Sequence, residues 1–144
     1  MTIIFLSQVA ATLLMTGITW FAQVVHYPLL SLVKGASFKE YQIVNMRLTT
    51  FVVGPLIGAE GLTAFLLLWQ RPTGVMISQV LIGIGLLAVI WLSTAFLQVP
   101  KHNILAQGFD VRAHRVLVIS NWIRTVAWSL RSLLVLWMVV GVAG

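Results

Sequence analysis

The chain has 144 residues, of which 60% are hydrophobic and only 8% are charged. Soluble globular proteins carry about 25% charged residues, so this composition, with a mean hydropathy of +1.01, excludes an ordinary soluble globule and predicts contact with lipid. Nine Lys and Arg against three acids give a formal net charge of +6. In a membrane protein an excess of basic residues marks the cytoplasmic loops and favours contact with anionic lipid head groups. We therefore expect no nucleic-acid partner. The lack of cysteine excludes disulfides, thiolate nucleophiles, zinc–thiolate sites and iron–sulfur clusters.

Four stretches are long and apolar enough to cross a bilayer, which takes about 20 residues each. They are roughly Ile3 to Val25, Thr50 to Trp69, Val75 to Leu97 and Leu117 to Val140. The first lacks the basic segment and the cleavage site of a secretory signal, so we expect it to remain as a span. Because no repeat or linker interrupts the chain, we predict one all-α transmembrane domain over residues 1–144, an antiparallel four-helix bundle.

The basic residues predict the orientation of the bundle. One of them, Arg71, lies in the tight turn between the second and third spans. Six lie in the two longer connections: Lys34, Lys39, Arg47, Lys101, Arg112 and Arg115. Positively charged loops stay in the cytoplasm. We therefore expect cytoplasmic longer connections and both termini outside.

Two capping signals predict that helices two and four extend into the cytoplasm. Ser37 and Glu40 have the spacing of a capping box, in which the hydroxyl and the carboxylate each accept a bond from a free backbone amide. Asp110 is a candidate N-cap for the fourth helix. Both residues precede the apolar stretches, so each helix should begin before it enters the membrane.

Two prolines predict irregular helix geometry. Pro55 lies inside the second span and predicts a kink, because its ring lacks an N–H and clashes with the preceding turn. Pro100 predicts the end of the third helix, because the residue before a proline avoids the helical conformation. Residues 101–109 would then form a short connecting segment.

Polar residues recur along one face of the first span. They are Gln8, Thr12, Thr16, Thr19, Gln23 and His26. Polar faces avoid acyl chains, so this one should line the bundle interior or meet a partner subunit. The threonines can bond back to carbonyls of their own helix. For Gln23 and His26, which have larger polar groups, simple packing and ligand binding both stay open.

Ionisable residues within spans are costly and need partners. Glu60 is the only acid within a span, and Arg131 lies near the midpoint of the fourth span. We predict that the two form an ion pair, whether direct, bridged by water or shared with Arg124, and we name all three as candidate catalytic residues. The alternatives are a structural latch for the pair and a head-group anchor for Arg124.

A third group of residues should meet at the cytoplasmic ends of the helices. His26 and His102 are candidate metal ligands, and Gln23 and Asn121 are candidate cofactor-binding residues beside them. Two neutral imidazoles at one depth can ligate haem iron or a non-haem metal, or polarise a quinone oxygen. The alternative is that these histidines bond to loop carbonyls.

Several segments together resemble a family of small uncharacterised bacterial four-span membrane proteins. These segments are Gln23 to Leu29, Phe38 to Tyr41, Pro55 with Glu60, Trp91 to Thr94, Val99 to His102, and Asn121 to Thr125 with Trp128 and Arg131. The resemblance implies a bacterial inner-membrane protein with four spans. Members of that family often have a histidine after the tyrosine near the start of helix two, whereas this chain has Gln42.

In size and span count the chain is also similar to anthrone-oxygenase-like membrane proteins. The stretch from Trp20 to Pro28 faintly resembles membrane protoporphyrinogen oxidases, which bind haem. These likenesses favour a redox or oxygenase-type membrane enzyme, or a haem-, metal- or quinone-binding protein. The alternative is a non-catalytic subunit of a larger respiratory or photosynthetic complex, and a small transporter is a third reading.

The spacing of two glycines in the second span predicts close packing of helices. Gly54 and Gly58 match the small-residue pattern that lets two membrane helices approach closely. The pattern predicts tight packing within the bundle or between copies, and thus leaves a homo-oligomer open.

Overall fold

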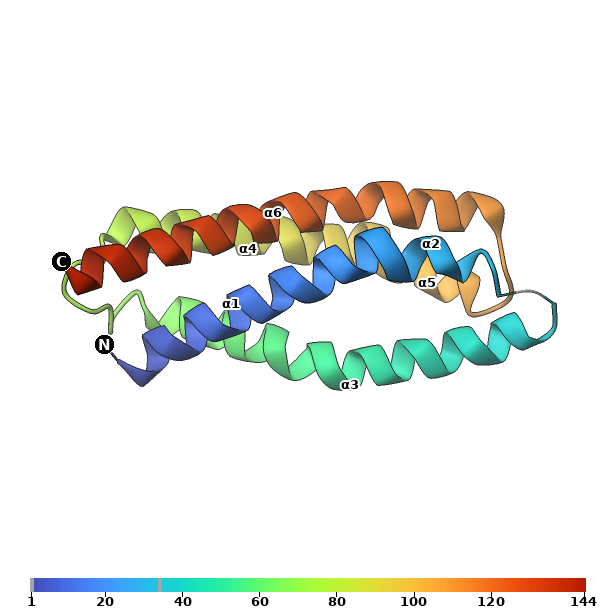
Figure 1. Cartoon of the computed structure of the whole chain (residues 1–144), viewed down its shortest axis with the longest axis horizontal. Coiled ribbons are helices and arrows are strands. Elements are labelled where there is room, and N and C mark those ends of the chain that lie inside the picture. The colour runs from blue at the N-terminus through green and yellow to red at the C-terminus, as the bar shows by residue number, and fades with distance from the viewer. Residues whose placement is uncertain (1, 34) are drawn as a thin grey trace.

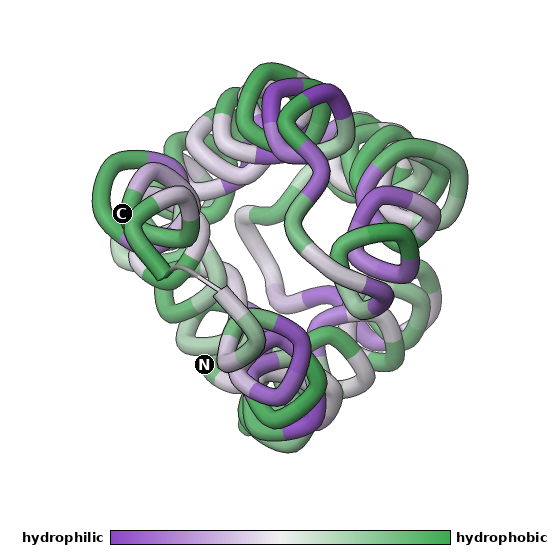
Figure 2. The backbone as a smooth tube through the Cα atoms, turned by 90° about the vertical axis from the view of Figure 1, so that its right-hand side faces the viewer, coloured by the Kyte–Doolittle hydropathy of each residue, from purple (hydrophilic) through white to green (hydrophobic). Residues whose placement is uncertain are grey.

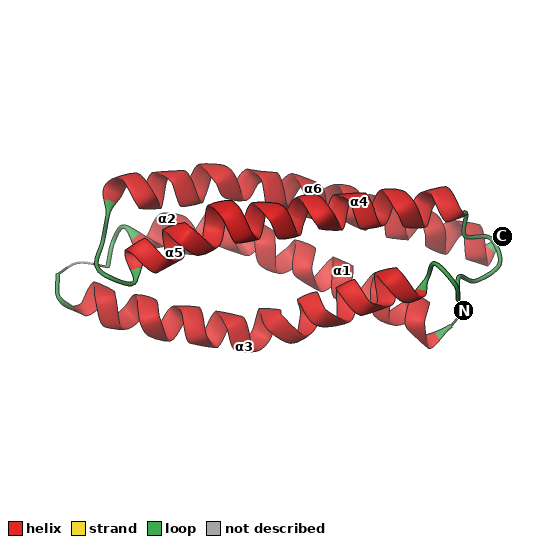
Figure 3. Ribbon diagram, turned by 180° about the vertical axis from the view of Figure 1, so that it is seen from behind, coloured by secondary structure: helices red, strands yellow, loops and turns green. Residues whose placement is uncertain are grey.

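The computed structural model describes residues 2–33 and 35–144, and this part of the chain folds as four long helices (Figures 1 and 3). Its elements are α1 (Ile3–Phe21), η1 (Ala22–His26), α2 (Tyr27–Leu30), α3 (Ser37–Leu66), α4 (Ile77–Ser93), η2 (Thr94–Gln98), α5 (Val99–Leu105) and α6 (Val111–Ala143). Elements α1, η1 and α2 form one continuous helix, and α4, η2 and α5 form another. Each of the four helices is long and apolar enough to cross a membrane.

The four helices pack as an all-α bundle, as the composition predicts. Helix α1 packs against α3 and α6, and α4 packs against α6. Both termini lie at one end, together with the connection from α3 to α4, while the two other connections lie at the opposite end (Figure 1). Seen along its length from that opposite end, the bundle has its helices arranged around a common centre (Figure 2).

The helix starts confirm one capping prediction and correct another. Asp110 caps α6, because its Oδ1 accepts a bond of 2.6 Å from the amide of Ala113. Helix α3 begins at Ser37, close to the predicted start, but the capping box is wrong. Ser37 is already helical, and Ala36 stands at the cap without a side-chain bond. Lys34, used for the orientation, lies outside the described residues.

The prediction that Pro100 ends the third helix is wrong. A π-turn, η2, precedes Val99, whose amide bonds to the carbonyl of Thr94. The wider turn takes up the register change that the proline requires, so the helix continues to Leu105. The first helix contains a similar π-turn, η1, before Pro28. This helix therefore extends past the expected end at Val25. Such π-turns are frequent at functional sites.

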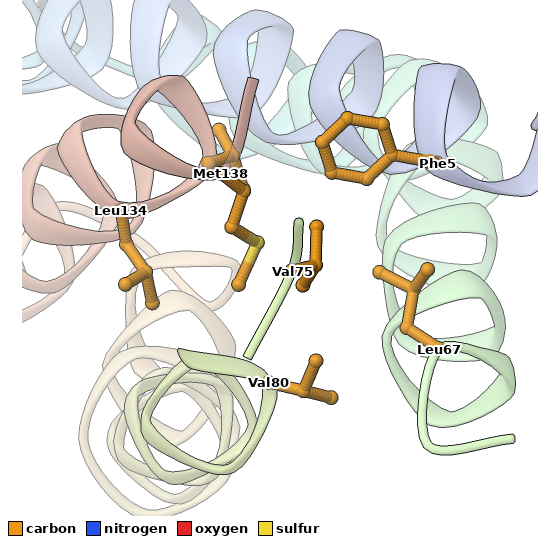
Figure 4. Close-up of a cluster of buried hydrophobic side chains, with 7 residues drawn as sticks. Phe5, Leu67, Val75, Val80, Leu134 and Met138 are labelled. Carbon is orange, nitrogen blue, oxygen red and sulfur yellow. The ribbon is translucent and has the colours of Figure 1, made fainter. Parts of the chain in front are cut away.

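Three clusters of buried apolar side chains hold the bundle together. At the end with the termini, Figure 4 shows side chains of all four helices meeting: Phe5, Leu67, Val75, Val80, Leu134 and Met138. A second cluster, around Tyr27 and Leu117, lies among the helix ends at the other two connections. The third surrounds Trp128. Two members of these clusters, Tyr27 and Trp128, also take part in the polar networks described below.

Helix α3 contains Pro55 and changes direction along its length (Figure 3). Around the proline it is poorly covered, since Gly54 and Gly58 have open space where a Cβ would lie. These two glycines therefore do not mediate packing within the bundle. The close approach occurs at Gly61, where a Cβ would lie 2.7 Å from the ring of Trp91 on α4.

Candidate functional site

The predicted ion pair between Glu60 and Arg131 is present. Nε of Arg131 donates to Oε1 of Glu60 over 2.9 Å, and both side chains are buried. A second guanidinium nitrogen donates to the backbone carbonyl of Gly83 on α4. The pair therefore links α3, α4 and α6.

Two further donors complete the binding of the Glu60 carboxylate. The indole Nε1 of Trp128 donates to Oε2 over 3.0 Å, and the hydroxyl of Thr12 donates to Oε1 over 3.0 Å. Thr12 in turn accepts a bond from the Gln8 amide, and Gln8 accepts one from Thr63. A buried charge is tolerated when its hydrogen bonds are made, and here all four helices contribute to this network.

The polar face of the first helix points inward, as predicted, but its threonines behave differently from one another. Thr16 and Thr19 each bond back to the carbonyl four residues earlier, at 2.8 Å. Thr12 instead binds Glu60, so it belongs to the ion-pair network. Thr16 also contacts the hydroxyl of Ser132 on α6 at 2.6 Å. Bonding back to the helix therefore accounts for Thr19, whereas Thr12 and Thr16 also bind other helices.

The structure pairs Gln23 with Asn121. Nδ2 of Asn121 donates to Oε1 of Gln23 over 2.9 Å, and Nε2 of Gln23 donates to the carbonyl of Val118. Both side chains are buried, at 4% and 1% exposure, so the contact joins η1 to α6. Within this pair, Oδ1 of Asn121 is buried without a hydrogen-bond partner.

His102 bonds to side chains on two other helices. Nε2 of Gln42 donates to Nδ1 of His102 over 3.0 Å, and the hydroxyl of Tyr27 lies 3.4 Å from Nε2. An amide nitrogen only donates, so Nδ1 accepts and a neutral ring carries its proton on Nε2. His102 is thus held by side chains and not by loop carbonyls. Gln42 is fully buried and also accepts a long bond from Asn45.

A cavity of about 160 Å³ lies between α3, η1 and α5. Its walls include both predicted histidines, so the structure places His26 and His102 at one pocket. The full lining is Ala22, His26, Tyr27, Asn45, Met46, Thr49, Thr50, Val99 and His102. Thr49 and Thr50 are exposed on α3, so the pocket opens on the surface of the bundle.

Arg124 does not share the Glu60 ion pair, contrary to that alternative. Its guanidinium carbon lies 5.2 Å from the ring centroid of Trp128, a cation–π contact on α6. Arg124 is only partly exposed, and it is not among the residues that line the pocket. Its Nε is buried without a hydrogen-bond partner.

The donor set fits a metal poorly. Among the described residues no group of three or more His, Asp or Glu side chains lies close enough to hold an ion. His102 also has its Nδ1 engaged by Gln42. The surrounding Tyr27, Asn45 and threonines suit an oxygen-bearing organic group better than a metal.

Sequence reasoning missed three contributors to these sites. Gln42 was considered only as a departure from a family pattern, yet it orients His102. Trp128 was noted only as part of the family resemblance, yet it binds Glu60. Tyr27 was seen only as part of a motif. In each case the partner lies on another helix, so spacing along the sequence could not identify it.

No protein-family model matches the chain, and neither a curated protein nor a solved structure is found to match it.

Proposed function

We propose that this protein binds the oxygenated head of a small lipid-soluble molecule of the quinone class in the pocket between α3, η1 and α5. The observation that carries the proposal is the pocket itself, whose walls combine two histidines, a tyrosine, an asparagine and two threonines with the apolar side chains of Ala22, Met46 and Val99. Convergent polar groups in an apolar cavity are typical of small-molecule sites.

The hydrogen-bond donors suit a ring carbonyl. The proton on Nε2 of His102 points toward Tyr27, and the 3.4 Å contact with that hydroxyl is long. Such contacts often tighten only when a ligand is bound. Asn45 supplies an amide from α3, and His26 supplies an imidazole from η1. A quinone oxygen between these groups would accept from one or more of them.

The size of the pocket limits what it encloses. Pockets that bury a drug-sized ligand measure roughly 300–1,000 Å³, whereas this one measures about 160 Å³. It therefore suits one ring or head group. An apolar tail would leave past Thr49 and Thr50, where α3 is exposed. This arrangement serves a redox enzyme or an accessory subunit that supplies a quinone to one.

Ligand binding by the purified protein tests this proposal. We expect 1,4-naphthoquinone to bind the protein in a neutral detergent, as measured by calorimetry. Thr50→Phe should abolish binding by filling the opening. Val52→Phe adds the same ring to an exposed position of α3 outside the pocket and should bind normally. Equal binding by wild type and Thr50→Phe would contradict the proposal.

A second candidate function is that of a non-catalytic subunit or a homo-oligomer. The observation that favours it is the open surface at Gly54 and Gly58 on α3, which no helix of this chain covers. Small residues allow another membrane helix to approach closely. Gly58→Leu should then release a partner or dissociate the oligomer in cross-linking experiments. An unchanged assembly would count against this candidate.

We also infer the orientation and location of the bundle, as one domain in the bacterial inner membrane. Arg71 lies at the end with the termini, and the described basic residues of the two longer connections lie at the other. The positive-inside rule supports a cytoplasmic location for that second end. Helices α3 and α6 would then begin in the cytoplasm, and the pocket would lie toward the cytoplasmic face.

A further inference from the structure

A second hollow opens on the surface of the bundle, at the end away from the termini. It lies where α2 packs beside the first turns of α6 (Figure 1). It measures about 440 Å³, and its walls include Ser31, just after α2, and Arg115, Val118 and Ile119 on one face of α6. We call it the α2–α6 hollow. It shares no lining residue with the pocket between α3, η1 and α5.

Arg115 supplies the charge of the α2–α6 hollow. Its side chain is exposed. In the part of the chain that the structure describes, the contact between Glu60 and Arg131 is the only salt bridge, so no acid of that part binds Arg115. The nearest acid along α6, Asp110, caps the helix through Oδ1. The guanidinium of Arg115 is therefore available to a ligand.

The histidine of the hollow already has a partner within the fold. Nε2 of His114 lies 2.7 Å from the backbone carbonyl of Tyr27. A carbonyl only accepts, so this nitrogen carries a proton and donates it there. The ring also packs against Phe109, at 5.4 Å between centroids. His114 thus shapes the wall, and an anion in the hollow would bind Arg115.

Arg115 lies at the depth of lipid head groups. Two positions after it, at Leu117, α6 begins the apolar stretch that is predicted to cross the bilayer. The first helix ends its apolar span at Leu30. Leu30 and Leu117 belong to one buried cluster, so both spans end at a similar depth. Basic side chains at this depth meet the phosphates of the bilayer.

Beyond Arg115 the same side of α6 is apolar and exposed. Ile119 is 63% exposed and Trp122 is 44% exposed, and they follow Arg115 by one and two helical turns. The Trp122 ring packs edge-on against Trp20 of α1, at 5.6 Å between centroids. Nε1 of Trp20 donates to Ser129. A cation followed by apolar side chains repeats the order of a phospholipid, from its phosphate to its acyl chains.

We propose that the α2–α6 hollow binds an anionic phospholipid, whose phosphate pairs with Arg115 and whose acyl chains lie along Ile119 and Trp122. The planar guanidinium binds two phosphate oxygens through parallel hydrogen bonds. Basic pockets between membrane helices are typical sites for acidic head groups. A zwitterionic head group would bring its own cation next to Arg115, so the anionic class is favoured.

Lipid binding to the delipidated full chain tests this proposal. Native mass spectrometry in a neutral detergent measures the dissociation constant of the first bound lipid. The two lipids are phosphatidylglycerol and phosphatidylcholine with identical acyl chains, and inorganic phosphate is the third probe. We expect wild type to bind phosphatidylglycerol about fivefold more tightly than phosphatidylcholine, which is roughly the effect of one basic residue near an acidic bilayer.

Matched variants separate the hollow from general charge. Arg115→Gln should bring the ratio to about one, and Arg115→Lys should keep part of it because the charge remains. Arg47→Gln removes the same charge from an exposed position of α3 outside the hollow and should keep the ratio. Ser31→Trp fills the hollow without changing its charge and should weaken binding of phosphatidylglycerol. Leu32→Trp adds the same ring to an exposed position outside it and should not.

The results divide cleanly for and against the lipid site. Losses confined to Arg115→Gln and Ser31→Trp support it. The proposal is overturned if wild type shows no preference, or if Arg115→Gln keeps the preference. Equal losses in Arg115→Gln and Arg47→Gln would also overturn it, because they indicate general charge. Inorganic phosphate that binds as tightly as phosphatidylglycerol would show that the hollow takes free phosphate, and would overturn the assignment to a lipid.

Discussion

Glu60 and Arg131 are buried together, with Nε of the arginine 2.9 Å from Oε1 of the carboxylate. Trp128 and Thr12 fill the remaining acceptor positions of the carboxylate, and Gly83 accepts from the guanidinium. Because every helix contributes to this network, it sets the register of the bundle. The cavity beside Gln8 and Arg131 measures only about 20 Å³, which favours a structural role for the pair.

Charge-removing variants of this pair should be strongly coupled. Glu60→Gln or Arg131→Gln alone leaves one buried charge uncompensated, which costs about 3–5 kcal/mol. The double variant should recover part of that loss, because neither charge remains. Thermal unfolding of the four proteins in one detergent measures the coupling. Simple additivity would show that the two groups do not stabilise each other.

Replacing Arg124 should affect the free energy of unfolding differently from replacing Arg131. In the ligand-free protein Arg124→Gln removes an unpaired charge, so the free energy of unfolding should be unchanged or higher. Arg131→Gln, the matched change on the same helix, should lower it. The comparison uses urea or thermal unfolding under identical conditions. A loss of stability in Arg124→Gln as large as in Arg131→Gln would indicate a structural partner for Arg124.

The glycines of α3 should differ sharply in their tolerance of a methyl group. Gly61→Ala would place a Cβ 2.7 Å from the Trp91 ring, and overpacking of this kind costs about 1–3 kcal/mol. Gly58→Ala meets open space and should be neutral or stabilising by up to about 1 kcal/mol through helix propensity. Thermal unfolding measures both effects. Equal destabilisation would mean that another chain covers Gly58.

Gln42 should matter through His102. Gln42→Leu removes the donor to Nδ1 and leaves a buried ring nitrogen without a partner, a loss of about 1–3 kcal/mol. Gln107→Leu changes an exposed residue of the same type and serves as the control. We also expect Gln42→Leu to weaken quinone binding, because His102 is no longer oriented. Unchanged stability and binding would show that Gln42 does not position His102.

The orientation can be measured directly. A reporter fused after Gly144 should be active only outside the cytoplasm, and one inserted in the connection at residues 106–110 should be active only inside it. The reason is that Lys and Arg are in excess at the end of the bundle that holds the connection at residues 106–110, and positively charged loops stay in the cytoplasm. A reporter after Gly144 that is active in the cytoplasm would reverse the assignment of the pocket to the cytoplasmic side.

Composition and periodicity predicted the parts of this fold that depend on local pattern. Four apolar runs gave four helices, and the spacing of polar residues on the first helix showed its buried face. The pairing of Glu60 with Arg131 could also be predicted, because a single acid within the spans leaves a buried cation few choices. Pro100 was misjudged, since a proline ends a helix unless a π-turn absorbs the register change, and that turn depends on packing.

The sequence alone determined that the chain is a lipid-facing helical bundle, because hydropathy and charge are properties of each residue that do not depend on its neighbours in the fold. Only the tertiary structure decided that Gln42 reaches His102, that Gln23 pairs with Asn121 and that Arg124 stays apart from Glu60. These contacts join residues on different helices, and the rotation and depth of each helix are set by side-chain packing across the whole bundle.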